Sequence, residues 1–239
     1  MGTLYIVATP IGNLEDITLR ALRILKEVDL IACEDTRHTK ILLDRYQIKK
    51  PTISYHQHTK LTKLDYLIKL LAEGKNIALV TDAGTPGISD PAGMLVSRVE
   101  EFNKALVTNR QSPIAISPIP GSSALTAALS VCGFPTDKVL FLGFLPKKKG
   151  RQSLLNKLNN LITKELKNFT IVLYESPYRL LKTLNDLRTT FGDCQIVVCR
   201  ELTKKFEEIK RGKISEMIEY YSKKEPKGEF TIIVQNAKL

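Results

Sequence analysis

Two carboxylates followed closely by an arginine make the segment Glu34-Asp35-Thr36-Arg37 a first candidate site for chemistry. The segment comes directly after the mostly apolar run 29–33, which has the pattern of a buried strand. A carboxylate beside a guanidinium can be fixed in position while it stays ionised, so it could act as a general base. The alternative is structural, because Asp35 or Thr36 could accept backbone amides at a helix start. The local sequence favours this capping role for one of them.

A second candidate is the glycine-rich segment 81–91, which follows the apolar run 76–80. The pattern predicts a strand, a loop and a helix, with Asp90 as the N-cap and Pro91 as the first helical residue. In an open α/β sheet, ligands bind at loops of this kind, and glycines such as Gly84 let the backbone approach a ligand closely. The segment contains neither G-x-x-x-x-G-K-[ST] nor G-x-G-x-x-G, so it predicts neither common nucleotide loop. The alternative is a tight connection without a ligand.

Three further loops follow predicted strands. The first, 10–13, follows the strand predicted at 3–9, and it could share a pocket floor with the loop at 81–91. The second, 120–124, precedes a helix whose free amides suit a carboxylate or a hydroxyl. The third, 174–177, contains Ser176 and Pro177, which helix capping explains, and Glu175, which capping does not explain.

Charge is distributed unevenly along the chain, whose formal net charge is +11. Residues 1–118 contain 15 basic and 13 acidic side chains, whereas residues 119–239 contain 21 and 12. This asymmetry favours a polyanionic partner for the second half, with nucleic acid as the first candidate. The cations at 200–205 and 210–213 suit phosphate contacts, although such runs can also be plain solvated surface.

Strand and helix patterns alternate along the whole chain, which predicts an α/β fold with mostly parallel or mixed sheets. Pro118 and Pro120 bracket a predicted hinge, beyond which the alternation starts again. The sequence therefore predicts two α/β domains, 1–118 and a basic domain 119–239, with a cofactor cleft between them.

Several classes of protein are not expected. The four cysteines show no C-x-x-C spacing and only three histidines are present, so we expect no metal site and no disulfide framework. No apolar stretch is long enough to span a bilayer, and the first residues lack the features of a signal peptide. A cytoplasmic protein without a membrane partner is therefore expected.

The motifs together closely resemble one family, the 16S rRNA (cytidine-2′-O)-methyltransferases of the ribosomal RNA small subunit methyltransferase I type, within the tetrapyrrole methylase superfamily. The resemblance runs essentially from end to end, in the same order. It rests on the segments 4–18, 32–38, 82–91, 119–124, 174–177, 200–206 and 227–230. It implies a cytoplasmic homodimer that binds S-adenosylmethionine in the cleft between its two domains. The implied reaction is methylation of the ribose of a cytidine in 16S rRNA of the small ribosomal subunit.

The resemblance also implies roles for particular residues. Positions that match cofactor contacts are Pro10, Ala83, Gly84, Thr85, Ile88, Ser123 and Ala124, with Glu175 as a weaker match. Positions that match substrate contacts are Asp35, Arg37, Arg179, Arg200 and Lys204. For the proton acceptor we favour Asp35 or Glu34, followed by Glu175, because a carboxylate at a strand end could take the ribose hydroxyl proton.

Segment 102–113 departs from the family pattern, because it exceeds the usual link between helix and strand by roughly ten residues. We expect it on the surface. Two other functions stay open: a methylase of a tetrapyrrole or another small molecule, and an RNA-binding module without catalysis. The basic second half argues against the first, and the intact glycine loops argue against the second.

Overall fold

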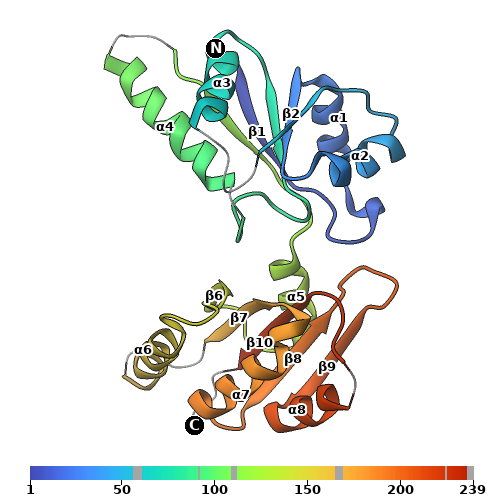
Figure 1. Cartoon of the computed structure of the whole chain (residues 1–239), viewed down its shortest axis with the longest axis vertical. Helices are drawn as coiled ribbons and strands as arrows, with labels where there is room; N and C mark the ends of the chain where they lie inside the picture. Colours follow the sequence, from blue (N-terminus) through green and yellow to red (C-terminus); the bar gives the residue numbers. More distant parts are fainter. Residues whose placement is uncertain (56–60, 91, 109–111, 165–168, 224, 236–239) are drawn as a thin grey trace. The chain divides into compact units, whose positions relative to one another are not determined.

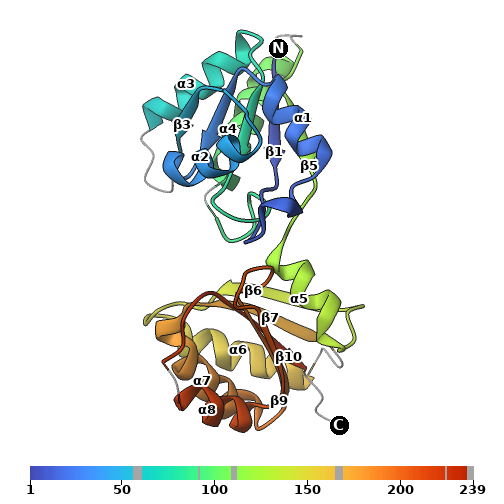
Figure 2. The same ribbon diagram turned by 90° about the vertical axis from the view of Figure 1, so that its right-hand side faces the viewer.

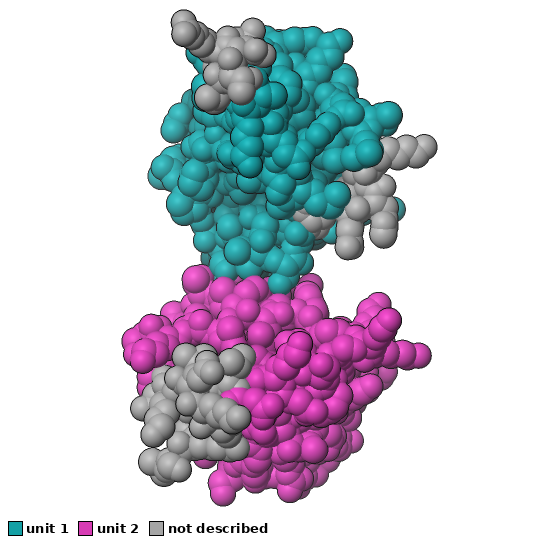
Figure 3. All heavy atoms as spheres, turned by 90° about the vertical axis from the view of Figure 1, so that its left-hand side faces the viewer, with its two compact units in different colours: residues 1–123 teal, residues 124–239 magenta. Residues whose placement is uncertain are grey.

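The computed structural model describes residues 1–55, 61–90, 92–108, 112–164, 169–223 and 225–235. The chain forms two compact units, Met1–Ser123 (unit 1) and Ala124–Leu239 (unit 2), which Figure 3 colours separately. The domain boundary expected after residue 118 falls inside strand β5 (Ala115–Ile119). This strand pairs with β1 (Thr3–Val7) from Thr3↔Ala115 to Val7↔Ile119, so β5 and the turn after it belong to unit 1. The expected cleft between the domains stays a prediction.

Unit 1 contains a five-stranded parallel sheet with the order β3-β2-β4-β1-β5. Its other strands are β2 (Leu30–Cys33), β3 (Thr52–Ser54) and β4 (Ile77–Val80). All four residues of β4 are buried, as expected for a central strand covered on both faces. Since every strand points the same way, the loops after β1, β2, β4 and β5 leave the same edge of the sheet.

Helices cover both faces of this sheet, as Figure 1 shows. One face packs against α1 (Leu19–Glu27) and α2 (Thr36–Arg45), and the other packs against α3 (Leu61–Ala72) and α4 (Ala92–Thr108). The short helix η1 (Leu14–Asp16) lies in the loop after β1. The loop after β4 therefore leads to one face, while the loops of its two neighbours, β1 and β2, lead to the other. Divergence of this kind at a sheet edge is where open α/β folds bind ligands.

We expected segment 102–113 to be a link on the surface, and this was wrong for the first part of the segment, residues 102–108. Helix α4 continues to Thr108, and Phe102 packs against the core between α3, α4 and the sheet. The side chain of Asn103 donates to the carbonyl of Ile114 at 2.9 Å and accepts from its amide at 2.8 Å. The segment thus extends the helix by about two turns. Residues 109–111, like Pro91 at the expected helix start, lie outside the described residues.

Unit 2 contains a mixed sheet with the order β6-β7-β10-β8-β9. Its strands are β6 (Val139–Phe144), β7 (Thr170–Glu175), β8 (Gln195–Arg200), β9 (Glu208–Lys213) and β10 (Phe230–Gln235). The strands β6 and β7 are parallel, whereas β10 runs antiparallel to both β7 and β8. The strands β6, β7 and β8 consequently point the same way and end at one edge.

The two faces of the second sheet are covered differently. Helices α6 (Arg151–Lys164), α7 (Leu180–Phe191) and α8 (Ile214–Ser222) form the main core on one face, and α5 (Ala124–Cys132) lies on the other (Figure 2). The short helix η2 (Pro177–Arg179) connects β7 to α7. The expected α/β fold with parallel and mixed sheets is confirmed. No helix in the described part of the chain is long and apolar enough to cross a bilayer.

Candidate functional site

The loops after β1 and β4 are joined by backbone hydrogen bonds. The amide of Thr9 donates to the carbonyl of Gly84 at 2.9 Å, and the amide of Gly84 donates back to the carbonyl of Thr9 at 3.0 Å. The hydroxyl of Thr9 also donates to the carbonyl of Thr81 at 3.0 Å. This pairing places Pro10 beside Gly84, so the two loops that the sequence predicted as one pocket floor do lie together.

The loop after β5 joins the same surface. The hydroxyl of Thr85 donates to the carbonyl of Ser122 at 3.0 Å, and the hydroxyl of Ser122 donates to the carbonyl of Asp16 at 3.0 Å. A Cβ added to Gly84 would lie 3.4 Å from Cγ2 of Ile11 and 3.8 Å from the carbonyl oxygen of Ser122. The three loops are thus held together mainly by backbone atoms and hydroxyl groups.

The glycine-rich loop presents small groups and backbone at its surface. Gly84 and Gly87 have φ angles of 84° and 91°, and Ser89 has 66°, a conformation unusual for a residue with a side chain. A Cβ added to Gly87 would meet no atom within 4 Å, so ligand atoms have room beside this backbone. Asp90 fixes the end of the loop, since its carboxylate accepts from the amides of Gly87 and Ala92 at 2.8 Å.

These features fit a nucleoside-like cofactor. The sequence placed seven residues at the cofactor, and six of them lie in the joined loops of unit 1: Pro10, Ala83, Gly84, Thr85, Ile88 and Ser123. The seventh, Ala124, begins α5, and one N-terminal amide of this helix, that of Leu125, donates to the hydroxyl of Tyr174 at 3.1 Å. Small side chains, exposed backbone and open space beside Gly87, together with the carboxylates of Asp82 and Asp90 in the same loop, suit an adenosine group better than a polyphosphate.

The loop after β2 carries the predicted carboxylates and connects to the loop after β4. The amide of Asp35 donates to Oδ1 of Asp82 at 3.1 Å. The Asp35 carboxylate also caps α2 by accepting from the amide of Arg37 at 2.8 Å, and it accepts from the Arg37 guanidinium at 2.7 and 3.1 Å. Hydrogen bonds from the guanidinium, followed by the one from the amide, hold the pKa of Asp35 below its ordinary value of 3.8. Asp35 therefore takes both roles considered from the sequence, a helix cap and a fixed ionised carboxylate, and its neighbour Glu34 is half-buried.

Glu175 lies in a different environment, in unit 2. Its side chain is fully buried, and its two oxygens accept from Nε and Nη2 of Arg179 at 2.7 and 3.0 Å. They also accept from the amide of Ser176 at 2.8 Å and the hydroxyl of Thr183 at 2.5 Å. A buried carboxylate with this many donors suits the positioning of Arg179 better than proton transfer.

The buried network extends to Arg151, which the sequence did not single out. Its side chain is 6% exposed and donates to the Thr183 hydroxyl and the Asp186 carboxylate, both at 2.7 Å. It also donates to the carbonyl of Pro146 at 3.3 Å, which fixes the start of the loop 146–150. The only sequence signal was an arginine at the end of a lysine run, and such a run is usually interpreted as solvated surface.

The remaining predicted substrate residues make contacts within unit 2. Nε of Arg200 donates to the carbonyl of Lys227 at 2.7 Å. Nζ of Lys204 donates to Glu229 at 2.7 Å and to Glu201 at 3.1 Å. Burial alone would lower the pKa of Lys204, but these two carboxylates raise it overall. Arg200 at the end of β8 and Lys204 in the loop after it thus contact the residues just before β10, near Glu175 at the end of β7.

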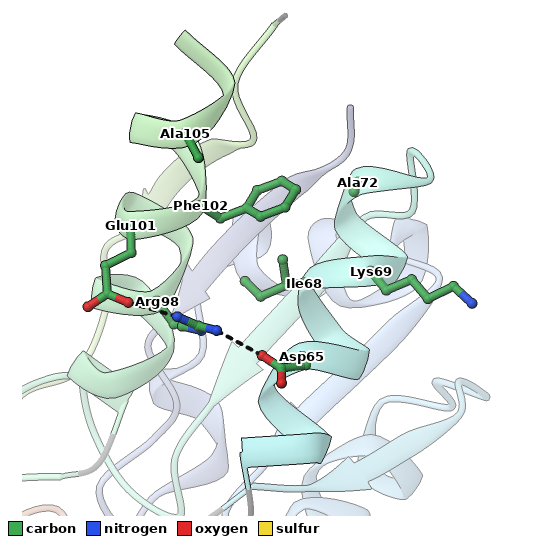
Figure 4. A pocket seen from close by; sticks show the side chains of 8 residues that line it. All are labelled: Asp65, Ile68, Lys69, Ala72, Arg98, Glu101, Phe102 and Ala105. Carbon is green, nitrogen blue, oxygen red and sulfur yellow. Dashed lines mark hydrogen bonds and ion pairs between the residues drawn. The ribbon is translucent and has the colours of Figure 1, made fainter. Parts of the chain in front are cut away.

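A separate pocket of about 530 Å³ lies between α3 and α4 (Figure 4). Its floor is apolar, with Ile68 and Phe102, and Arg98 at its rim pairs with Asp65 at 3.1 Å and Glu101 at 3.0 Å. These helices cover the sheet face away from α1 and α2, and none of the predicted site residues lines the pocket.

Unit 1 has a parallel sheet with joined strand-end loops, and unit 2 has a mixed sheet. Together these two units define the class of protein to which the chain belongs. The family model of tetrapyrrole (corrin/porphyrin) methylases matches residues 3–218, so the chain belongs to this family. Among curated relatives, the ribosomal RNA small subunit methyltransferase I of Thermotoga maritima is 46% identical over 234 residues and covers 98% of each chain. The protein of the same name from Synechocystis sp. is 48% identical over 239 residues, covering 99% of this chain and 80% of that protein. The expected family is therefore confirmed.

Solved structures share the fold at low sequence identity. The methyltransferase CobJ superposes with a TM-score of 0.71 at 17% identity, covering 99% of this chain and 95% of that one. A uroporphyrin-III C-methyltransferase from Thermus thermophilus, solved with the S-adenosylhomocysteine form of the cofactor, gives a TM-score of 0.65 at 16% identity, with 98% and 97% covered.

Proposed function

We propose that this protein is an S-adenosylmethionine-dependent methyltransferase that modifies the 2′-hydroxyl of a cytidine ribose in 16S rRNA. The names of its relatives, at 46% and 48% identity over nearly the whole chain, support rRNA of the small subunit as the substrate. S-adenosylhomocysteine in a structure of the same fold supports the cofactor. The observation that carries the proposal is the joining of the loops after β1, β4 and β5 through Thr9, Gly84, Thr85 and Ser122.

The cofactor would be held by these loops. Gly84 and Gly87 would let its adenosine and methionine parts approach the backbone, and Ile88, 40% exposed, would cover an apolar portion. When bound, S-adenosylmethionine supplies an electrophilic methyl group, and the protein supplies alignment and proton removal. The fixed loops would reduce the entropy lost on bringing the reacting atoms into line.

For proton removal we favour Asp35, with Glu34 beside it. Asp35 is ionised at neutral pH, as an aspartate ordinarily is, and Arg37 lowers its pKa further; the hydrogen bond from its amide to Asp82 fixes it next to the glycine-rich loop. A low pKa makes it a weak base on its own, so RNA contacts that draw Arg37 away would raise its basicity. The Arg37 side chain is 90% exposed, which leaves it accessible to a phosphate.

The rRNA would bind mainly to unit 2. Its residues 124–239 contain 21 basic and 12 acidic side chains, and phosphate neutralisation by lysine and arginine dominates nucleic-acid affinity. Arg179, Arg200 and Lys204 would shape this surface, while Glu175 would hold Arg179 in place. A homodimer and a cytoplasmic location, both implied by the family resemblance, complete the proposal.

The test is methyl transfer from labelled S-adenosylmethionine to small ribosomal subunits and, separately, to naked rRNA, followed by nuclease mapping. We expect alkali-resistant label at a single cytidine ribose, because 2′-O-methylation blocks attack by the neighbouring hydroxyl. Label on a base would contradict the ribose assignment. Cofactor binding without any RNA label would contradict the substrate, and a small-molecule substrate would then be tested.

A further inference from the structure

Three aromatic rings are exposed at one edge of the unit 2 sheet. Phe144 ends β6 and is 54% exposed, Tyr178 follows β7 and is 92% exposed, and Phe206 follows β8 and is 64% exposed. Large apolar side chains that gather on a surface indicate an interaction site, whereas isolated ones need no explanation. The topology decides whether these three belong together.

The strand register brings them to the same edge. Phe144 is the partner of Tyr174, one residue before the end of β7. In the next row, Phe230 of β10 is the partner of both Glu175, which ends β7, and Arg200, which ends β8. From β6 to β8 is three strand spacings, or about 14 Å. This length corresponds to about four nucleotides at the stacked rise of 3.4 Å.

Cations lie among the rings. Lys147, Lys148 and Lys149 are exposed in the loop directly after β6. Nζ of Lys205, also exposed, lies 5.8 Å from the ring centroid of Phe206. The edge therefore combines flat apolar surface with positive charge, and the exposed Glu207 follows Phe206 directly. We call Phe144, Lys147–Lys149, Tyr178, Lys205 and Phe206 the aromatic edge.

Hydrogen bonds within unit 2 hold the loops that carry the aromatic edge in place. Arg151 holds the start of the lysine loop through the Pro146 carbonyl, Glu175 fixes Arg179 next to Tyr178, and Lys204 ties the loop before Phe206 to Glu201 and Glu229. The cations predicted from sequence as substrate contacts thus make internal contacts that fix the loops. The rings and lysines beside them remain exposed.

We propose that the aromatic edge binds an unpaired RNA segment, with bases stacked on Tyr178 and Phe206 and phosphates contacted by the lysines. The inference rests on the proposed function and specifies the form of RNA recognised. Stacking needs open base faces, which a single strand offers and a duplex does not, and the combination of exposed rings with cations is typical of single-strand binding surfaces. A purely electrostatic surface for duplex RNA would not require exposed rings.

The test compares binding of two labelled RNAs of about 12 nucleotides, one unpaired and one annealed to its complement, by fluorescence anisotropy at fixed salt. For Tyr178→Ala we expect affinity for the unpaired RNA to fall about 5- to 150-fold, the effect of losing one stacked base. Tyr178→Phe should keep the affinity because the ring remains. Tyr66→Ala is the matched control, since Tyr66 is an exposed tyrosine of α3 in unit 1 and is 49% exposed.

The phosphate contacts proposed for the lysines are tested separately, by the salt dependence of RNA affinity. For each of Lys147, Lys148 and Lys149 that contacts a phosphate, replacement by alanine should reduce the slope of log affinity against log salt by about 0.7. Equal affinity of wild type and Tyr178→Ala for unpaired RNA, preference for the duplex, or no binding by wild type would each overturn the proposal. The proposed reaction is judged by methyl transfer, so failure of the reaction leaves the binding result interpretable by itself.

Discussion

The two carboxylate and arginine pairs of this protein have nearly the same geometry but opposite environments. The shortest contact is 2.7 Å both between Asp35 and Arg37 and between Glu175 and Arg179. In the first pair the side chains are 34% and 90% exposed, whereas in the second they are 0% and 20% exposed. In sequence, the carboxylate of each pair follows a predicted strand and precedes a predicted helix, but only Asp35 and Arg37 were considered together.

From this difference we expect the more exposed pair to serve the proposed site and the buried pair to serve the fold. An exposed ion pair is screened by water and contributes little to stability, so Asp35 and Arg37 remain available to a substrate. A buried pair has lost its hydration, so each group depends on the other and on Thr183. Substitutions in the two pairs and in the joined loops of unit 1 test this contrast.

Replacing the buried carboxylate should have the largest effect. For Glu175→Ala we expect a loss of about 3–5 kcal/mol in the free energy of unfolding, because Arg179 loses its buried partner. Urea unfolding followed by circular dichroism measures the loss. The matched variant is Asp35→Ala, for which the midpoint should shift far less. Equal shifts for the two variants would show that burial does not distinguish the pairs.

The joined loops of unit 1 depend on backbone conformation instead of buried charge. Gly84→Ala should lower the free energy of unfolding by about 1–2 kcal/mol, since its φ of 84° is unfavourable for alanine. It should also weaken S-adenosylmethionine binding, measured by calorimetry. The control is Gly93→Ala in α4, where an added Cβ meets no atom within 4 Å and helix propensity favours alanine. Unchanged cofactor affinity in Gly84→Ala would remove Gly84 from the cofactor site.

Asp35→Asn should separate activity from stability. Asparagine caps helices as well as aspartate does, so the urea midpoint should change little. Methyl transfer should fall about 10²- to 10⁴-fold if Asp35 takes the proton. Asp44→Asn, at an exposed position of the same helix, is the control and should keep full turnover. Full turnover in Asp35→Asn would exclude Asp35 as the base and leave Glu34 as the next candidate.

Arg37→Gln should change the pH at which Asp35 titrates, and it should have the smallest effect on the free energy of unfolding. In the folded protein the pKa of Asp35 lies below 3.8, so its stabilising contribution is complete above that pH and is lost as pH falls through the lowered pKa. Without the guanidinium the pKa should rise toward 3.8, and the midpoint of Asp35 titration should move up with it. Carboxyl NMR titration of wild type and variant measures the change. An unmoved midpoint would mean that the amide cap alone lowers the pKa.

Much of the fold was predictable from local sequence. The apolar runs that became β1, β2 and β4 are short, rich in branched residues and followed by small or acidic residues, so they indicated both the strands and the edge with the candidate site. The boundary between the two units was harder to predict from the sequence. Two prolines suggested a hinge, but the pairing of β5 with β1 is a long-range contact that places the division after Ser123. The length of α4 was not predicted either. The side chain of Asn103 forms hydrogen bonds with the backbone of Ile114, and no local sequence pattern reveals these contacts.

The alternation of strands and helices, the glycine loop, the uneven charge and the resemblance to one family all follow from the amino-acid sequence alone. These depend on residue type and spacing along the chain. Three features could be seen only in the folded chain: Asp35 is half-buried while Glu175 is fully buried, Arg151 belongs to the core, and Phe144, Tyr178 and Phe206 share one edge. Burial and strand register depend on residues far apart in the chain, and burial determines how strongly an ion pair is tied to the stability of the fold.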